Sequence, residues 1–133
     1  MEKKTSLNDR SNLLDISIST VSKKLTDLES RMRDYISVLD KRISVTIISQ
    51  GYSSGEDCTV VKSDRLKVIK TSTLGLSKSR NIALASCESE WLWFQDDDID
   101  LDVSNVNKLC DYLAGSEKNM VFLRFGRPRI IQF

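Results

Sequence analysis

The hydrophobic residues of this chain change period along its length, and that change most constrains the fold. Short runs rich in β-branched residues predict strands, whereas apolar residues spaced by threes and fours predict helices. The predicted order is strand, helix, strand, strand, helix, strand, helix, strand, over residues 13–19, 21–39, 43–49, 66–70, 77–85, 91–94, 103–113 and 120–125. Strands that alternate with helices are typical of an α/β fold, with a mostly parallel sheet and flanking helices.

The length of 133 residues suits one domain of this class. We expect residues 1–12 to be a flexible tail, because they are polar, and residues 13–133 to form the domain. Ser22 is the expected N-cap of the first helix, and Ser77 is the expected N-cap of the second.

The chain contains no histidine, which excludes Ser-His-Asp triads, Cys-His pairs and His-ligated zinc. Its three cysteines form no CxxC pair and are odd in number, so a reducing, cytoplasmic location fits better than a disulfide framework. No stretch approaches the roughly 20 apolar residues of a membrane span. A net charge of +1 gives no reason to expect nucleic acid as a partner.

Charge is balanced overall but unevenly distributed. Residues 62–80 contain six basic side chains and one acid, whereas residues 81–107 contain seven acids and no base. A basic segment followed by an acidic one suits a diphosphate ligand that carries a divalent metal. The alternative is a solvated loop beside a solvated helix face.

The strongest single signal is an acidic cluster after an apolar run. Trp91-Leu92-Trp93-Phe94 predicts a strand covered on both faces, and Asp96, Asp97 and Asp98 follow it. Open α/β sheets bind ligands beyond the carboxyl ends of their strands. If the segment stays extended, Asp96 and Asp98 share a face, and Mg²⁺ or Mn²⁺ would offset the repulsion of the carboxylates. The alternative is that these acids cap the following helix, a role that Asp102 can also fill.

A second signal is the run Gly75-Leu-Ser77-Lys-Ser-Arg80-Asn81. A glycine followed by a helix start leaves free backbone N–H groups at the positive end of the helix dipole. The planar guanidinium of Arg80 suits phosphate. By itself this run is also compatible with an ordinary capped helix that carries an exposed arginine.

Together the two motifs are more specific. The glycine-led helix, followed about ten residues later by a tryptophan-rich strand and Asp96-Asp97-Asp98, resembles family 2 glycosyltransferases of the GT-A fold, in particular their Rossmann-like nucleotide-binding half. The resemblance implies that Asp98 binds Mn²⁺ or Mg²⁺ and that Asp96 is the second acid, on the ribose or metal side. Asp97 is then the variable middle residue, and Arg80 and Asn81 line the nucleotide. Ser19, Gly75 and Ser77 are further candidates for binding the nucleotide-diphosphate sugar.

The same resemblance implies hexosyltransferase-type activity on a glycan or lipid-linked acceptor. It also implies a place in surface-polysaccharide synthesis at the cytoplasmic face of the membrane. The metal would neutralise charge on the departing nucleoside diphosphate. The basic side chains of residues 23–42 would also allow peripheral contact with a membrane surface.

The sequence departs from the family pattern in three places. The first strand ends in Ser19-Thr20-Val21, without the family's proline and asparagine. The acidic turn after the second strand is replaced by residues 50–57, in which Tyr52 is a candidate for stacking on the base and Glu56 or Asp57 for contacting it. Only 35 residues follow Asp98. We therefore expect a truncated enzyme, or a half that needs a partner.

The short C-terminal part leaves the catalytic base unidentified. The acids after Asp102 are Asp111 and Glu117, and neither is a convincing base. The apolar run at residues 130–133 favours self-association.

Two alternatives remain open at this point. The chain is an inactive remnant that keeps nucleotide binding, or it is an oligomerising interaction protein. The second alternative rests on the helix at residues 21–39, whose apolar stripe satisfies about two and a half heptads.

Overall fold

The computed structural model describes residues 12–53 and 59–116. The elements are β1 (Leu14–Val21), a single 3₁₀ turn (Ser22–Lys24), α1 (Leu25–Ile36), β2 (Ile43–Gln50), β3 (Val60–Ser63), β4 (Leu66–Thr71), α2 (Leu76–Ser86), β5 (Trp91–Asp96) and α3 (Val103–Ala114). The predicted α/β class is confirmed. The flexible tail, Cys58, the final strand at 120–125 and the apolar run at 130–133 fall outside the described residues, except for Asn12.

The described strands form one sheet in the order β3-β4-β2-β1-β5. All neighbours pair parallel except β3 and β4, which form an antiparallel hairpin. The sequence pattern did not predict β3, because this strand is four residues long and its valines, Val60 and Val61, are exposed. Asp64 and Arg65 make the hairpin turn at positive φ, although neither is a glycine.

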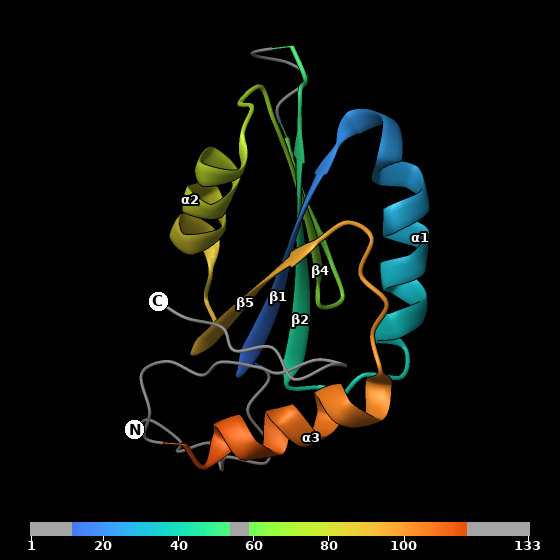
Figure 1. Cartoon of the computed structure of the whole chain (residues 1–133), viewed down its shortest axis with the longest axis vertical. Helices are drawn as coiled ribbons and strands as arrows, with labels where there is room; N and C mark the ends of the chain where they lie inside the picture. The colour runs from blue at the N-terminus through green and yellow to red at the C-terminus, as the bar shows by residue number, and fades with distance from the viewer. Residues whose placement is uncertain (1–11, 54–58, 117–133) are drawn as a thin grey trace, which may run out of the picture.

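The two crossover helices cover opposite faces of the sheet, with α1 and α2 on either side of β1 in Figure 1. The reason is the strand order. From β1 the chain moves one way to β2, and from β4 it returns past both to β5. Because parallel crossovers are right-handed, connections that run in opposite directions place their helices on opposite faces. We call the two faces the α1 face and the α2 face.

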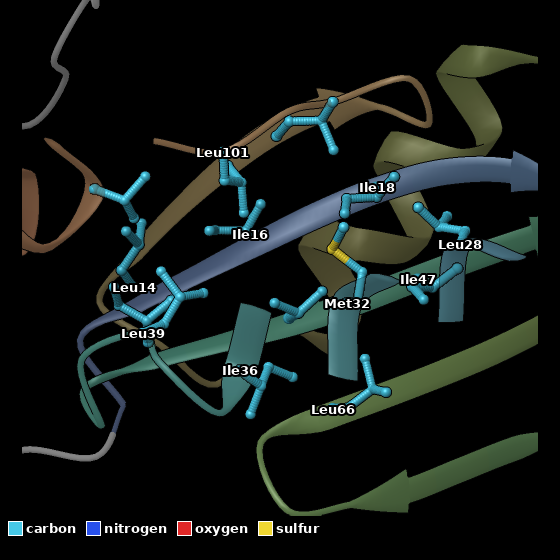
Figure 2. Packing of buried hydrophobic residues seen from close by; sticks show 14 of the residues in the cluster. Leu14, Ile16, Ile18, Leu28, Met32, Ile36, Leu39, Ile47, Leu66 and Leu101 are labelled. Carbon is cyan, nitrogen blue, oxygen red and sulfur yellow. The ribbon is translucent and has the colours of Figure 1, made fainter. Parts of the chain in front are cut away.

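The main hydrophobic core lies on the α1 face. Leu28, Met32 and Ile36 of α1 pack against Ile16 and Ile18 of β1, and all five are at most 5% exposed (Figure 2). The apolar stripe of α1 is thus buried within this chain. Since it is not free to pair with a second chain, the interaction-protein hypothesis built on it is wrong. The predicted role of the stripe as a crossover helix is confirmed.

The third helix closes the amino ends of the strands. Val106, Cys110 and Leu113 of α3 join the same core, and Figure 1 shows α3 lying across the lower end of the sheet. Asp102 caps α3 by accepting a hydrogen bond from the backbone N–H of Asn105 at 3.1 Å. The predicted helix and its capping acid are both confirmed.

Both predicted serine caps are wrong. β1 continues to Val21, so Ser22 enters a 3₁₀ turn, and neither that turn nor α1 has a side-chain cap. The N-cap of α2 is Gly75 at φ +102°, a conformation that glycine adopts without strain. Helix α2 therefore begins at Leu76, and Ser77 lies in its first turn.

The tryptophan-rich strand is also less buried than predicted. Trp91, Leu92, Trp93 and Phe94 are only partly buried. Within the described residues, β5 is an edge strand that pairs with β1 alone. The described residues therefore do not cover this strand fully on both faces.

Candidate functional site

The candidate site lies at the carboxyl ends of β1 and β5. These two strands are neighbours. The connection that leaves β1 runs to β2 on one side of it, whereas the connection that enters β5 arrives on the other side. Such a reversal opens a crevice beyond the strand ends, where α/β sheets bind ligands. Ser19 and Asp96 are register partners at this point, so the end of the first strand and the first acid of the triplet lie side by side.

Helix α2 is held against the α2 face at the same place. The hydroxyl of Ser79, which is fully buried, lies 2.5 Å from the hydroxyl of Ser19. The guanidinium carbon of Arg80 lies 5.3 Å from the centre of the Phe94 ring, within the range of a cation–π contact. Ser19, Arg80 and Asp96 therefore come together from three elements.

The turn before α2 is fixed by the second strand. Gln50, the last residue of β2, donates from its side-chain amide to the carbonyl oxygen of Gly75 at 2.9 Å. That bond orients the glycine whose positive φ starts the helix. The first-turn amides of α2 thereby face the carboxyl edge of the sheet from a fixed position.

The acidic triplet is split between a strand and a turn. Asp96 ends β5, whereas Asp97 and Asp98 form a turn in which the backbone N–H of Ile99 donates to the carbonyl oxygen of Asp96 at 3.2 Å. The prediction that an extended segment places Asp96 and Asp98 on one face is therefore wrong in its premise. Strand alternation ends at Asp96.

Asp97 is turned toward the other face of the sheet. Its carboxylate accepts a hydrogen bond from the hydroxyl of Thr20 at 2.9 Å and lies 3.7 Å from the ammonium of Lys24. Its side chain is 23% exposed. The middle acid is thus engaged with the end of β1 and the 3₁₀ turn before α1.

The other predicted binding residues are accessible. Their exposed members are Gly75, Ser77, Arg80, Asn81, Asp96 and Asp98. The carboxylates of Asp96 and Asp98 make no hydrogen bond or ion pair with any other described residue. Solvent-facing carboxylates at a strand end are suited to a ligand that arrives from outside the chain.

The donor set fits a shared metal site but not a site made by protein alone. The described residues contain no group of three or more His, Cys, Asp or Glu side chains able to hold a metal. Mg²⁺ commonly binds one or two carboxylates and completes its shell with water and substrate phosphates. Asp96 and Asp98 supply carboxylates of that kind.

Tyr52 does not have the free ring that stacking on a base requires. Its hydroxyl lies 3.0 Å from that of Ser49, its ring packs against the main core, and the ammonium of Lys70 lies 5.5 Å from the ring centre. A stacked base would have to displace Lys70. Glu56 and Asp57 fall outside the described residues.

Of the two acids considered as catalytic base, Asp111 is committed elsewhere. Asp111 lies on α3, across the amino ends of the strands, and its carboxylate accepts a hydrogen bond from Arg42 at 2.5 Å. Asp40 binds the same guanidinium at 2.8 Å. Glu117 lies outside the described residues.

A second polar feature lies at the opposite end of the α2 face. Asp15 is 3% exposed, and its carboxylate accepts hydrogen bonds from Thr46 at 2.9 Å and Ser44 at 3.3 Å. Burial raises the pKa of Asp15 above its usual range, against the effect of these hydroxyl groups. The three side chains line a pocket of about 180 Å³ at the amino ends of the strands.

Several residues that shape the site were not predicted from the sequence. They are Thr20, Gln50 and Ser79, together with Arg31, which bonds the carbonyl oxygens of the turn after β5. Ser79 carried a signal, since small residues alternate at Ser77 and Ser79. No local sequence signal pointed to Gln50 or Arg31, because their hydrogen-bond partners lie 25 and 66 residues away in the chain.

Comparison with known proteins gives one family. The sequence model of the family described as Glycosyl transferase family 2 matches residues 35–130, well over half of the chain. That range contains both the Gly75–Asn81 motif and the acidic triplet, while β1 lies before it. The searches of curated proteins and of solved structures returned no match.

Proposed function

The chain belongs to glycosyl transferase family 2, and on that premise we propose that its carboxyl edge binds a nucleoside-diphosphate sugar for transfer of the sugar. The proposed acceptor is a glycan or a lipid-linked acceptor at the cytoplasmic face of the membrane, and the group transferred is a hexosyl group. One observation carries the proposal: Ser19, Arg80 and Asp96 converge at the point where the strand order reverses.

Each end of the site has a proposed role. Asp98, together with Asp96, would hold Mg²⁺ or Mn²⁺, which when bound neutralises charge on the leaving diphosphate. Arg80 and the first-turn amides of α2 would bind phosphate oxygens, since a guanidinium and a helix N-terminus both favour anions. Ser77 and Asn81 lie on the exposed part of the same helix and would line the nucleotide.

The membrane part of the proposal concerns surface contact only. None of the described helices is long and apolar enough to cross a membrane. The Lys and Arg side chains of residues 23–42, which include the 3₁₀ turn before α1, would make the contact with anionic lipid.

Thermal unfolding with UDP or GDP, each with Mn²⁺, tests donor binding. At a ligand concentration of about 100 times the dissociation constant, binding stabilises the folded state by about 2.7 kcal/mol, which raises the melting temperature. Asp98→Asn should abolish the shift. Asp34→Asn is the matched control, because Asp34 is an exposed acid of α1 away from the strand ends.

An unchanged melting temperature with both nucleotides would contradict the proposal. So would an Asp98→Asn variant that responds as the wild type does. A shift without sugar transfer or donor hydrolysis would instead favour the inactive, nucleotide-binding remnant.

A further inference from the structure

One side chain of α1, that of Arg31, binds the backbone of the turn that carries the acidic triplet. The guanidinium of Arg31 donates to the carbonyl oxygen of Asp97 at 2.7 Å and to that of Ile99 at 3.1 Å. The two acceptors flank residue 98 on either side. The third contact of Arg31 is with Asp27, at 3.2 Å, and it holds the guanidinium against its own helix.

A second residue of α1 holds the next part of the same loop. Tyr35 donates its hydroxyl proton to Asp100 at 2.8 Å and accepts a hydrogen bond from the backbone N–H of Leu101 at 3.1 Å. Leu101 is buried in the main core. Arg31 and Tyr35 therefore attach the loop after β5 to the second half of α1, and Figure 1 shows the loop running beside that part of the helix.

Asp97 completes the attachment from the loop side. Its carboxylate is bonded to Thr20 and lies beside Lys24, at the end of β1 and just before α1. The backbone carbonyl and the side chain of the same residue thus both bind the α1 side. Asp98, the next residue, is exposed.

We propose that Arg31 and Asp97 are positioning residues that fix the backbone on both sides of Asp98, and that Asp97 is not itself a metal ligand. This inference rests on the proposed function for the role of Asp98. A carboxylate on a fixed backbone keeps its place without its own side-chain partners, which leaves its oxygens free for a cation. Residues that orient ligands in this way typically contribute about 10- to 100-fold to metal affinity.

The choice of an arginine follows from the geometry. A planar guanidinium has several N–H donors in a fixed arrangement, so it can bond two carbonyl oxygens at once. The ammonium of a lysine is a compact point charge on a flexible stem. We therefore expect Arg31→Lys to lie between the wild type and Arg31→Ala in every measurement.

The first experiment needs no ligand. Amide hydrogen exchange of the full chain should show Ile99 and Leu101 exchanging about tenfold faster or more in Arg31→Ala, while the amides of α1 and β1 stay as in the wild type. Arg33→Ala is the matched control, because Arg33 pairs with Glu29 one helical turn away, as Arg31 does with Asp27, but does not contact the loop. Exchange of the loop at the wild-type rate in Arg31→Ala would overturn the proposal.

The second experiment measures the affinity of the protein for Mn²⁺ in the presence of UDP or of GDP. The electron paramagnetic resonance signal of free Mn²⁺ gives the fraction that stays unbound. Asp97→Asn, which keeps an oxygen acceptor for Thr20, should retain Mn²⁺ affinity within about threefold, whereas Asp98→Asn should lose it. Arg31→Ala should weaken it about tenfold. An Asp97→Asn variant as defective as Asp98→Asn would make Asp97 a ligand and overturn the proposal.

The two experiments separate this inference from the proposed function. If wild-type protein binds neither nucleotide with Mn²⁺ but the loop loosens in Arg31→Ala alone, the fixed loop stands and the donor site falls. If Mn²⁺ and nucleotide bind while Arg31→Ala changes neither exchange nor affinity, the donor site stands and this inference falls.

Discussion

The two faces of β1 show how one strand serves two purposes. On the α1 face, β1 presents Leu14, Ile16 and Ile18, all at most 1% exposed and packed in the main core. On the α2 face it presents Asp15, Ser17 and Ser19. Both sets are largely covered, but the first is held by apolar packing, whereas Asp15 and Ser19 of the second are held by hydrogen bonds.

The hydrophobic contacts of the α2 face are correspondingly few. Its buried apolar cluster consists of Ile48, Ile69 and Ala83, with Ile82, Leu92 and Phe94 partly buried against it. Stability thus comes mainly from the α1 face, and the polar α2 face carries the residues proposed to meet the donor. The same division explains why the triplet splits, with Asp97 held on the α1 side and Asp96 beside Ser19.

The largest expected effect lies on the α1 face. Met32→Ala removes a side chain that is 0% exposed, so the free energy of unfolding should fall by about 2 to 5 kcal/mol. Urea unfolding followed by circular dichroism measures the loss. A loss below about 1 kcal/mol would show that this face does not dominate stability.

A smaller effect is expected where the α2 face meets the site. Ser79→Ala removes the hydroxyl that contacts Ser19, and the free energy of unfolding should fall by about 1 kcal/mol. Urea unfolding gives the value, and Ser104→Ala, at an exposed position of α3, is the control. A decrease equal to that of Met32→Ala would contradict the division between the faces.

Two acids, the buried Asp15 and the partly buried Asp40, should respond to pH in opposite directions. Burial raises the pKa of Asp15, so the folded state binds the proton more tightly, and the contribution of Asp15 to stability is lost as pH rises from its usual range through the raised pKa. The hydrogen bond from Arg42 lowers the pKa of Asp40, so the contribution of Asp40 is lost as pH falls through the lowered value.

Urea unfolding between pH 3 and pH 7 tests both signs. The stability of Asp15→Asn relative to the wild type should rise with pH, and that of Asp40→Asn should fall. Differences that do not change with pH, or that change in the same direction for both variants, would refute this assignment.

The smallest effect belongs to the outer side of α2. Leu84 is 59% exposed, so Leu84→Gln should change the free energy of unfolding by no more than about 0.5 kcal/mol. Thermal unfolding is sufficient to measure it. A larger decrease would mean that the α2 face has an apolar contact beyond those of Ile48, Ile69 and Ala83.

Much of the fold could be predicted from local pattern. The stripe of α1, the β-branched run of β2 and the apolar face of α3 each have a period that only one element satisfies. The strand β3 could not be predicted, because it is short and exposed and is held by its partner β4 rather than by its own pattern. The burial of the tryptophan-rich strand was overestimated for a related reason: composition does not reveal whether a strand lies at an edge.

The sequence by itself determined the class of fold, the family and the residues available at the strand ends, because hydrophobic period and short motifs are local properties. Only the tertiary structure decided which of those residues meet. The pairing of Ser19 with Asp96, the approach of Arg80 to Phe94 and the grip of Arg31 on residues 97 and 99 join segments far apart in the chain. Such contacts depend on strand order and crossover handedness, and these are set by how the whole chain packs.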